Sequence, residues 1–108
     1  MWQVINKFRE LNGKYHANFE DDKHNCLMHC LHMCRINRYE HTPFDLLGKW
    51  DSEAVGVIEY SNWWKDRIIF DWFGKSETHR NVLLNYNILT CCDFINNGKV
   101  WVVIRGRN

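Results

Sequence analysis

The stretch of sequence that decides the fold joins an aromatic segment to the start of a helix, and it reads Trp72-Phe73-Gly74-Lys75-Ser76-Glu77-Thr78-His79-Arg80-Asn81-Val82-Leu83-Leu84. Glycine is common just after a helix ends, and serine is a preferred N-cap. The stretch therefore predicts that one helix ends at Gly74 and that a short one begins after Ser76. His79 lies beside this irregular junction, where binding side chains tend to concentrate.

The residues before this stretch predict a helix that follows a short strand. Trp64, Ile68 and Trp72 recur at every fourth position, with Ile69 and Phe73 beside them, which predicts one apolar face on a helix that Ser61 could cap. Residues 54–58 are short, β-branched and bounded by polar residues, which is typical of a strand.

The N-terminal half predicts two helices and a connection. The first helix covers about residues 2–11, because apolar residues recur every three to four positions and Asn12-Gly13 follows. The second runs to about residue 37 from Asn18 as N-cap, with Asp21 at the capping-box position. We expect its buried stripe to comprise Phe19, Leu27, Cys30, Leu31 and Cys34. Residues 39–52 read as an irregular connection with at most one helical turn.

The C-terminal third changes to the period of a β-hairpin. Residues 86–95 and 99–105 are rich in Ile, Val, Thr and aromatic residues, and Asn96-Asn97-Gly98 joins them. Asn and Gly tolerate the positive φ angles of a tight hairpin turn. The helices and this hairpin are expected to share one core in a single domain over residues 1–108.

Composition restricts the function classes. The 108 residues carry 14 Lys and Arg against 13 Asp and Glu, a formal net charge of +1, without a basic stripe. This argues against electrostatic binding of nucleic acid. No apolar run approaches the roughly 20 residues that span a bilayer, and the N-terminus lacks the apolar region of a signal peptide. The chain is thus expected in the cytoplasm if it is complete, or outside the cell if a leader was removed.

The five cysteines read as reduced core residues. Cys91 and Cys92 are adjacent, and three others fall four positions apart, unlike a disulfide framework. Residues 24–34 hold three His and three Cys, which on paper could bind Zn²⁺, but their spacing matches no standard zinc site. We interpret these thiols as core and these histidines as partly exposed. Neither Cys91 nor Cys92 has a local feature that would make it a nucleophile.

Three segments resemble CAP domains, the superfamily of cysteine-rich secretory proteins, antigen 5 and plant pathogenesis-related proteins. Asn6-Lys7-Phe8-Arg9-Glu10-Leu11-Asn12-Gly13 resembles the opening helix of that family. The helix over residues 19–37, followed by His41, is similar to the second helix and the first family histidine. Residues 72–84 are similar to the aromatic-x2-Ser-x2-His-Arg-x-x-Leu signature of compact bacterial members.

The resemblance implies an α+β fold, a compact α-β-α sandwich with a small antiparallel sheet and a C-terminal β-hairpin. It also implies a cleft lined by two histidines and an acidic residue, here His41, His79 and Glu53, with Glu59 as the substitute for Glu53. Ser76 stands where eukaryotic members carry a second glutamate. Two imidazoles and one carboxylate would suit a divalent metal such as Zn²⁺ with an open fourth position.

Three functions remain open. The first is a small CAP-like binding domain whose cleft takes a ligand or metal and whose surface engages a macromolecule; no catalytic residue is assigned. The second is an intracellular inhibitor from a phage or mobile element that occludes a host protein, because aromatic residues often anchor binding surfaces. The third is a metal-dependent hydrolase. Trp63, Trp64 and Trp101 are the first candidates for a protein-partner surface.

Overall fold

A four-stranded mixed sheet lies at the centre of the computed structural model, which describes residues 1–108 except for the side chain of Lys23. The strands are β1 (Asn18–Phe19), β2 (Ser52–Glu59), β3 (Ile88–Asn96) and β4 (Lys99–Arg107), in the order β1-β3-β4-β2. β2 and β3 pair with β4 in antiparallel fashion, and β1 adds to β3 in parallel. β2 is therefore an edge strand, with β4 along one side only.

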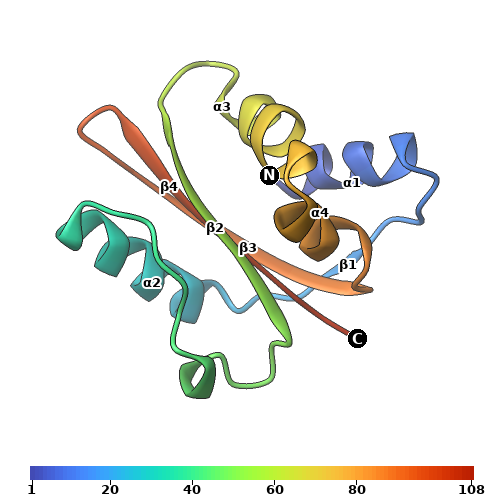
Figure 1. The fold of residues 1–108 in the computed structure, drawn as a ribbon, viewed down its shortest axis with the longest axis horizontal. Coiled ribbons are helices and arrows are strands. Elements are labelled where there is room, and N and C mark those ends of the chain that lie inside the picture. Colours follow the sequence, from blue (N-terminus) through green and yellow to red (C-terminus); the bar gives the residue numbers. More distant parts are fainter.

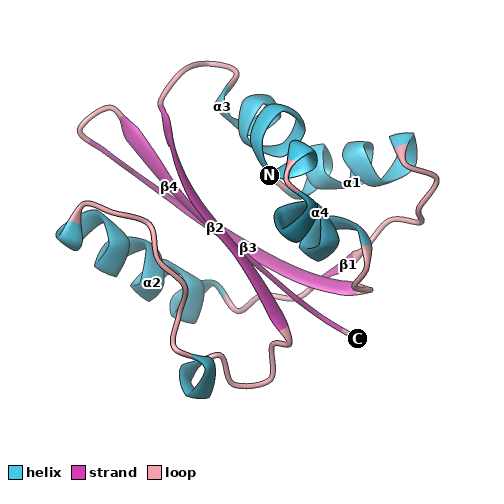
Figure 2. Ribbon diagram, viewed as in Figure 1, coloured by secondary structure: helices cyan, strands magenta, loops and turns pink.

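Helices cover both faces of this sheet (Figure 1). On one face lies α2 (Lys23–Ile36), and on the other lie α1 (Trp2–Leu11), α3 (Trp64–Asp66) and α4 (Glu77–Leu84). Figure 2 shows that the connection from α2 to β2 carries one short helical turn, the 3-10 helix Phe44–Leu46, as predicted for residues 39–52. The predicted α-β-α sandwich is confirmed, although β1 makes the sheet mixed instead of wholly antiparallel.

Strand periodicity divides the core into two layers. On β4, Val100, Val102 and Ile104 pack toward α1, α3 and α4, whereas Trp101 and Val103 pack toward α2. All five are almost fully buried, because successive side chains of a strand point to opposite faces and both faces are covered. The next residue on the α2 face is Arg105, which is equally buried. A charged group in that position requires a partner.

The hairpin and the first helix are as predicted. Asn97 and Gly98 take φ angles of 51° and 74°, and the strands pair from Asn96 opposite Lys99 onward. This is the turn geometry for which Asn-Gly is best suited. α1 covers Trp2–Leu11, and its Asn6 and Arg9 are buried. Arg9 donates to the carbonyls of Tyr15, Leu83 and Tyr86, so it ties α1 to the end of α4.

The predicted start of the second helix was wrong. Asn18 and Phe19 form β1, opposite Ile88 and Leu89, and α2 begins only at Lys23, with Asp22 as N-cap. The buried stripe is rotated as well: Cys26, His29, Cys30 and Met33 are buried, whereas Leu27, Leu31 and Cys34 are only half-buried. Pairing of Asn18 with a strand 70 positions away overrides its local preference for a cap.

The third helix corrects another prediction. After α3 the backbone forms a π-helical segment, Arg67–Trp72, and then a 3-10 turn, Phe73–Lys75. Ile68, Ile69 and Phe73 are buried, but Trp72 is 58% exposed. A π-helix bonds residue i to i+5, so the wider turn moves position 72 off the buried face and brings position 73 onto it. No helix in the described part of the chain is long and apolar enough to cross a membrane.

Candidate functional site

The three residues predicted for the cleft gather around the first half of β2. Glu53 lies on β2 itself, directly opposite Arg105 of β4. His41 reaches it from the loop after α2, and His79 reaches the neighbouring Val55 from α4. The alternative acid, Glu59, lies exposed at the far end of β2, so Glu53 is the acid beside His41.

Four donors surround the Glu53 carboxylate. Oε1 accepts from the Thr42 backbone N–H at 2.8 Å and from His41 Nδ1 at 3.2 Å. Oε2 accepts from the Thr42 hydroxyl at 2.6 Å and from Arg105 Nε at 3.0 Å. The Thr42 hydroxyl in turn accepts from Arg105 Nη2 at 2.9 Å. A carboxylate offers about four acceptor positions, and all four are in use.

This network keeps Glu53 ionised inside the protein. The Glu53 and Arg105 side chains are only 2% and 3% exposed. Burial alone would raise the pKa of Glu53, but hydrogen bonds from Thr42 and Arg105 outweigh burial and hold the pKa below its ordinary value. The pair therefore fixes the loop before β2 to the sheet and gives His41 a defined neighbour.

His41 has one nitrogen left for a ligand. Its side chain is 65% exposed, and Nδ1 faces Glu53 Oε1. Donation from Nδ1 to the carboxylate leaves Nε2 as the free acceptor of the neutral ring.

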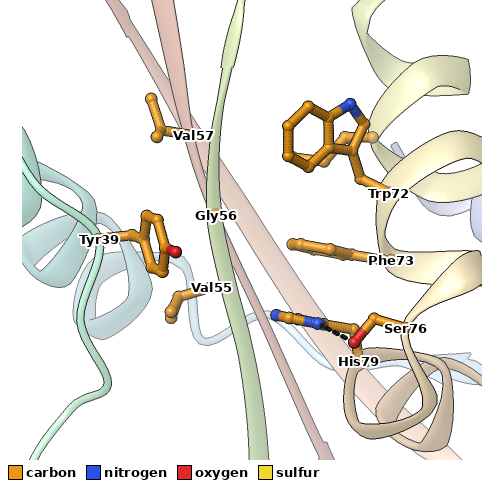
Figure 3. Close-up of a pocket in the computed structure, with 9 residues that line it drawn as sticks. Tyr39, Val55, Gly56, Val57, Trp72, Phe73, Ser76 and His79 are labelled. Carbon is orange, nitrogen blue, oxygen red and sulfur yellow. Dashed lines mark hydrogen bonds between the residues drawn. The ribbon is translucent and has the colours of Figure 1, made fainter.

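His79 is held between the Ser76 hydroxyl and the edge of β2 (Figure 3). Nδ1 lies 2.8 Å from the Ser76 hydroxyl, and the ring also forms a hydrogen bond with the Val55 backbone. The ring stacks on Phe73 with centroids 4.7 Å apart and an interplanar angle of 4°. Burial lowers the pKa of His79, and the charge of nearby His41 lowers it further, while the bond to the Val55 backbone opposes them. His79 is thus a neutral ring that fastens α4 to the edge of β2.

The arrangement of His41, Glu53 and His79 does not fit a resident zinc ion. Zinc needs ligands with an available lone pair, yet the acceptor positions of Glu53 are filled and His79 Nδ1 already lies 2.8 Å from the Ser76 hydroxyl. The three side chains also line three different hollows. Among the side chains that the structure describes, no group of three His, Cys, Asp or Glu is placed to hold a metal. Zinc at this position stays an untested prediction.

A cleft of about 140 Å³ crosses the free edge of β2 at Val55, Gly56 and Val57 (Figure 3). Tyr39 flanks the cleft on the α2 side of the sheet. The opposite side is formed by residues of the π-helical segment, the 3-10 turn and the start of α4, namely Ile68, Trp72, Phe73, Ser76 and His79. Gly56 is required here: an added Cβ would lie 2.9 Å from Phe73 Cε1. The cleft is mostly apolar, and its lining includes the Ser76 and Tyr39 hydroxyls and the His79 ring.

Sequence reasoning missed four residues of this region. Thr42 and Arg105 complete the Glu53 network, and Tyr39 and Trp72 border the cleft. A buried-strand pattern interrupted by Arg105 was the available signal, because a charge on a buried face implies a partner. Nothing local marks Tyr39, which is 64% exposed in an irregular loop.

The crowded helix at residues 24–34 is mainly structural, as interpreted. All five cysteines are reduced, and Cys26 and Cys30 are fully buried between α2 and the sheet. Burial raises the pKa of Cys26 to about 12. The expectation for the histidines is corrected at His29, which is 8% exposed and bonds to the Glu40 carbonyl through Nε2 at 2.7 Å.

Two of the three candidate tryptophans for a partner surface belong to the core. Trp64 and Trp101 are buried in opposite layers. Trp63 is 69% exposed, so it alone of these three is available to a partner.

Comparison with known proteins gives the fold. No protein-family model matches the chain, and no curated protein matches it. Among solved structures it is similar to a cysteine-rich secretory protein from Staphylococcus aureus, with a TM-score of 0.67 and 15% sequence identity. The likeness covers 98% of this chain but 36% of that one, so the chain spans about a third of its neighbour's length. At this identity the comparison shows that the chain has a CAP-like fold.

Proposed function

We propose that this chain is a small CAP-like binding domain whose cleft at the edge of β2 takes an apolar group about the size of a benzene ring. The observation that carries the proposal is the cleft itself: about 140 Å³, bordered by Tyr39, Trp72 and Phe73. A cavity of similar size lined by apolar residues is known to accept benzene. Apolar concave surfaces with a few polar groups are the usual ligand sites.

The polar groups near the first half of β2 favour binding over catalysis. Glu53 is neutralised by Arg105, and His79 is held by Ser76 and Val55. A general base needs a lone pair within reach of the proton that it removes. Of His41, Glu53 and His79, it is His41 that keeps a ring nitrogen exposed to solvent, and His41 does not line this cleft. We therefore assign no hydrolytic step.

The test is titration with indole, followed by amide NMR. We expect the largest shifts at Val55, Gly56 and Val57, because these residues line the cleft. Trp72→Ala should weaken indole binding while leaving stability nearly unchanged, since this side chain is 58% exposed. Trp63→Ala is the matched control, because Trp63 is similarly exposed but lies outside the cleft. Equal weakening by both variants, or shifts spread over other surfaces, would contradict the proposal.

A further inference from the structure

The free edge of β2 carries backbone groups that point away from the sheet. The Asn97-Gly98 turn pairs Asn96 with Lys99, and in a two-residue hairpin this closing pair exchanges both of its hydrogen bonds. By alternation, Val100, Val102 and Ile104 direct their backbone groups toward β2. The bond from Tyr60 N–H to Gly98 O continues the same alternation.

Alternate residues of β2 direct their backbone N–H and C=O groups away from β4. Ala54, Gly56 and Ile58 stand opposite Ile104, Val102 and Val100, so they bond to β4. Val55, Val57 and Glu59 must then direct N–H and C=O away from it. The interaction of His79 with the Val55 backbone agrees with this assignment, since it reaches β2 from outside the sheet. Within the described part of the chain, no hydrogen bond from outside the sheet reaches the Val57 backbone.

We infer that an extended peptide adds to β2 as a fifth strand, with its backbone paired to Val57 and Glu59 and one apolar side chain in the cleft. This inference rests on the proposed function and names its ligand class. Main-chain pairing gives affinity in such complexes, and pockets for alternate side chains give specificity. The cleft satisfies the second condition at the same point on the strand, because Val55, Gly56 and Val57 line it.

The size of the site selects a peptide. About 140 Å³ holds one side chain, whereas drug-sized ligands occupy pockets of roughly 300–1,000 Å³. The outward-facing stretch Val57–Glu59 is also far too short to supply the roughly 800 Å² per partner of a stable protein dimer. Tyr39 on one side of β2 and Trp72 on the other (Figure 3) would receive the alternate side chains of a single strand.

Hydrogen exchange of the free protein tests the first step. The Val57 and Glu59 amides should exchange much faster than those of Gly56 and Ile58, which bond to β4. If Val57 exchanges as slowly as Gly56 in the free protein, its N–H already has a partner and the inference fails.

Binding is tested with a capped hexapeptide, acetyl-Val-Thr-Phe-Thr-Val-Lys-amide, and two derivatives N-methylated on alternate residues. We expect the parent peptide to slow exchange at Val57. One methylated derivative should lose about tenfold in affinity or more and the other should retain binding, since only one set of peptide amides faces β2. No binding by the parent, or an equal effect of both methylation patterns, overturns the inference.

Variants of the protein give an independent readout. Val57→Pro removes the outward N–H without removing a bond to β4, and proline is tolerated on edge strands. It should abolish peptide binding, whereas Val57→Ala, which keeps the N–H, should reduce binding only modestly. If Val57→Pro does not fold, the methylated peptides decide alone.

Indole separates the two proposals. If indole shifts the cleft amides while the peptide does not bind, the apolar cleft stands and strand addition fails. If neither binds, both proposals fail. Self-association that Val57→Pro abolishes would show that a second copy occupies the edge, which also overturns the inference.

Discussion

Glu53 joins three parts of the chain that are distant in sequence: the loop at Thr42, strand β2 and Arg105 on β4. Its ion pair with Arg105 is among the most buried polar contacts of the molecule. A buried charge is tolerated only when its partners satisfy it, and here each oxygen accepts twice. Glu53 therefore holds the loop at Thr42 against the sheet.

Removal of Arg105 should leave the Glu53 carboxylate buried without its charged partner. We expect Arg105→Met to lower the free energy of unfolding by about 3–5 kcal/mol near neutral pH, as for other broken buried pairs. The loss of unfolding free energy should be smaller at low pH, where Glu53 is protonated and carries no charge that needs a partner. Urea unfolding at both pH values measures it. Arg107→Met is the control, because its ion pair with Glu20 is partly exposed to solvent and should contribute little to stability.

His79 should make stability depend on pH. Its folded-state pKa lies below the ordinary 6.5, so the unfolded chain binds more protons in that window. The contribution of His79 is complete above pH 6.5 and is lost as the pH falls through the folded-state pKa. His79→Gln, which does not titrate, should show a smaller fall in unfolding free energy between about pH 7 and about pH 5. An unchanged pH slope would refute the assignment.

Zinc should not stabilise the protein. Because the acceptor positions of Glu53 are filled, and His41, Glu53 and His79 line three different hollows, added Zn²⁺ is expected to leave Tm unchanged. Thermal unfolding with and without the metal measures this. A rise in Tm that disappears in His41→Ala would restore the metal site implied by the family resemblance.

At the scale of elements, the contact between β2 and the 3-10 turn shapes the cleft. The π-helical segment brings Phe73 onto the buried face, and Gly56 admits its ring against the strand. Phe73 then supports the His79 ring by stacking. The irregular helix thus determines which aromatic residue enters the core and which, Trp72, stays at the rim.

Gly56→Ala tests this contact. A Cβ at 2.9 Å from the Phe73 ring forces movement, so we expect a loss of about 1–3 kcal/mol, the range for overpacking. Alanine has no backbone penalty relative to glycine in a strand, so a loss reports the clash. Phe73→Leu in the Gly56→Ala background should recover part of it. Additive effects in the double-mutant cycle would rule out this coupling.

At the scale of the whole molecule, the sheet separates an aliphatic and aromatic layer from a sulfur-rich one. Cys26, Cys30, Met33 and Cys92 pack with Val55, Trp101 and Val103 beneath α2. A hydrogen bond with the Cys92 thiol and burial both raise the pKa of Cys30. Cys26 and Cys30 are therefore packing residues with very little thiolate.

Alkylation should follow this division. We expect iodoacetamide to modify half-buried Cys34 in the native protein, and Cys26 and Cys30 only after unfolding. Mass spectrometry of protein labelled with and without urea measures the order. Equally fast native labelling of Cys26 and Cys34 would show that the layer opens readily.

The sequence by itself determined the features that depend on neighbouring residues. The Asn97-Gly98 turn, the first helix and the Ser76 start of α4 follow from local backbone preferences, and each is found where predicted. The resemblance to CAP domains also led to the correct fold class. His41 and Glu53 were selected from a resemblance, and the structure does place them in contact.

Only the tertiary structure decided the rest, because it depends on contacts between residues far apart in the chain. Pairing with Ile88 made a strand of Asn18, which by its local signals would cap a helix. Arg105, 52 positions from Glu53, donates a hydrogen bond to the carboxylate that the resemblance suggested as a metal ligand. The cleft exists because Tyr39 and Trp72 reach one strand edge from opposite faces of the sheet. Local patterns carry no information about such an approach, since packing free energy is set by the whole core.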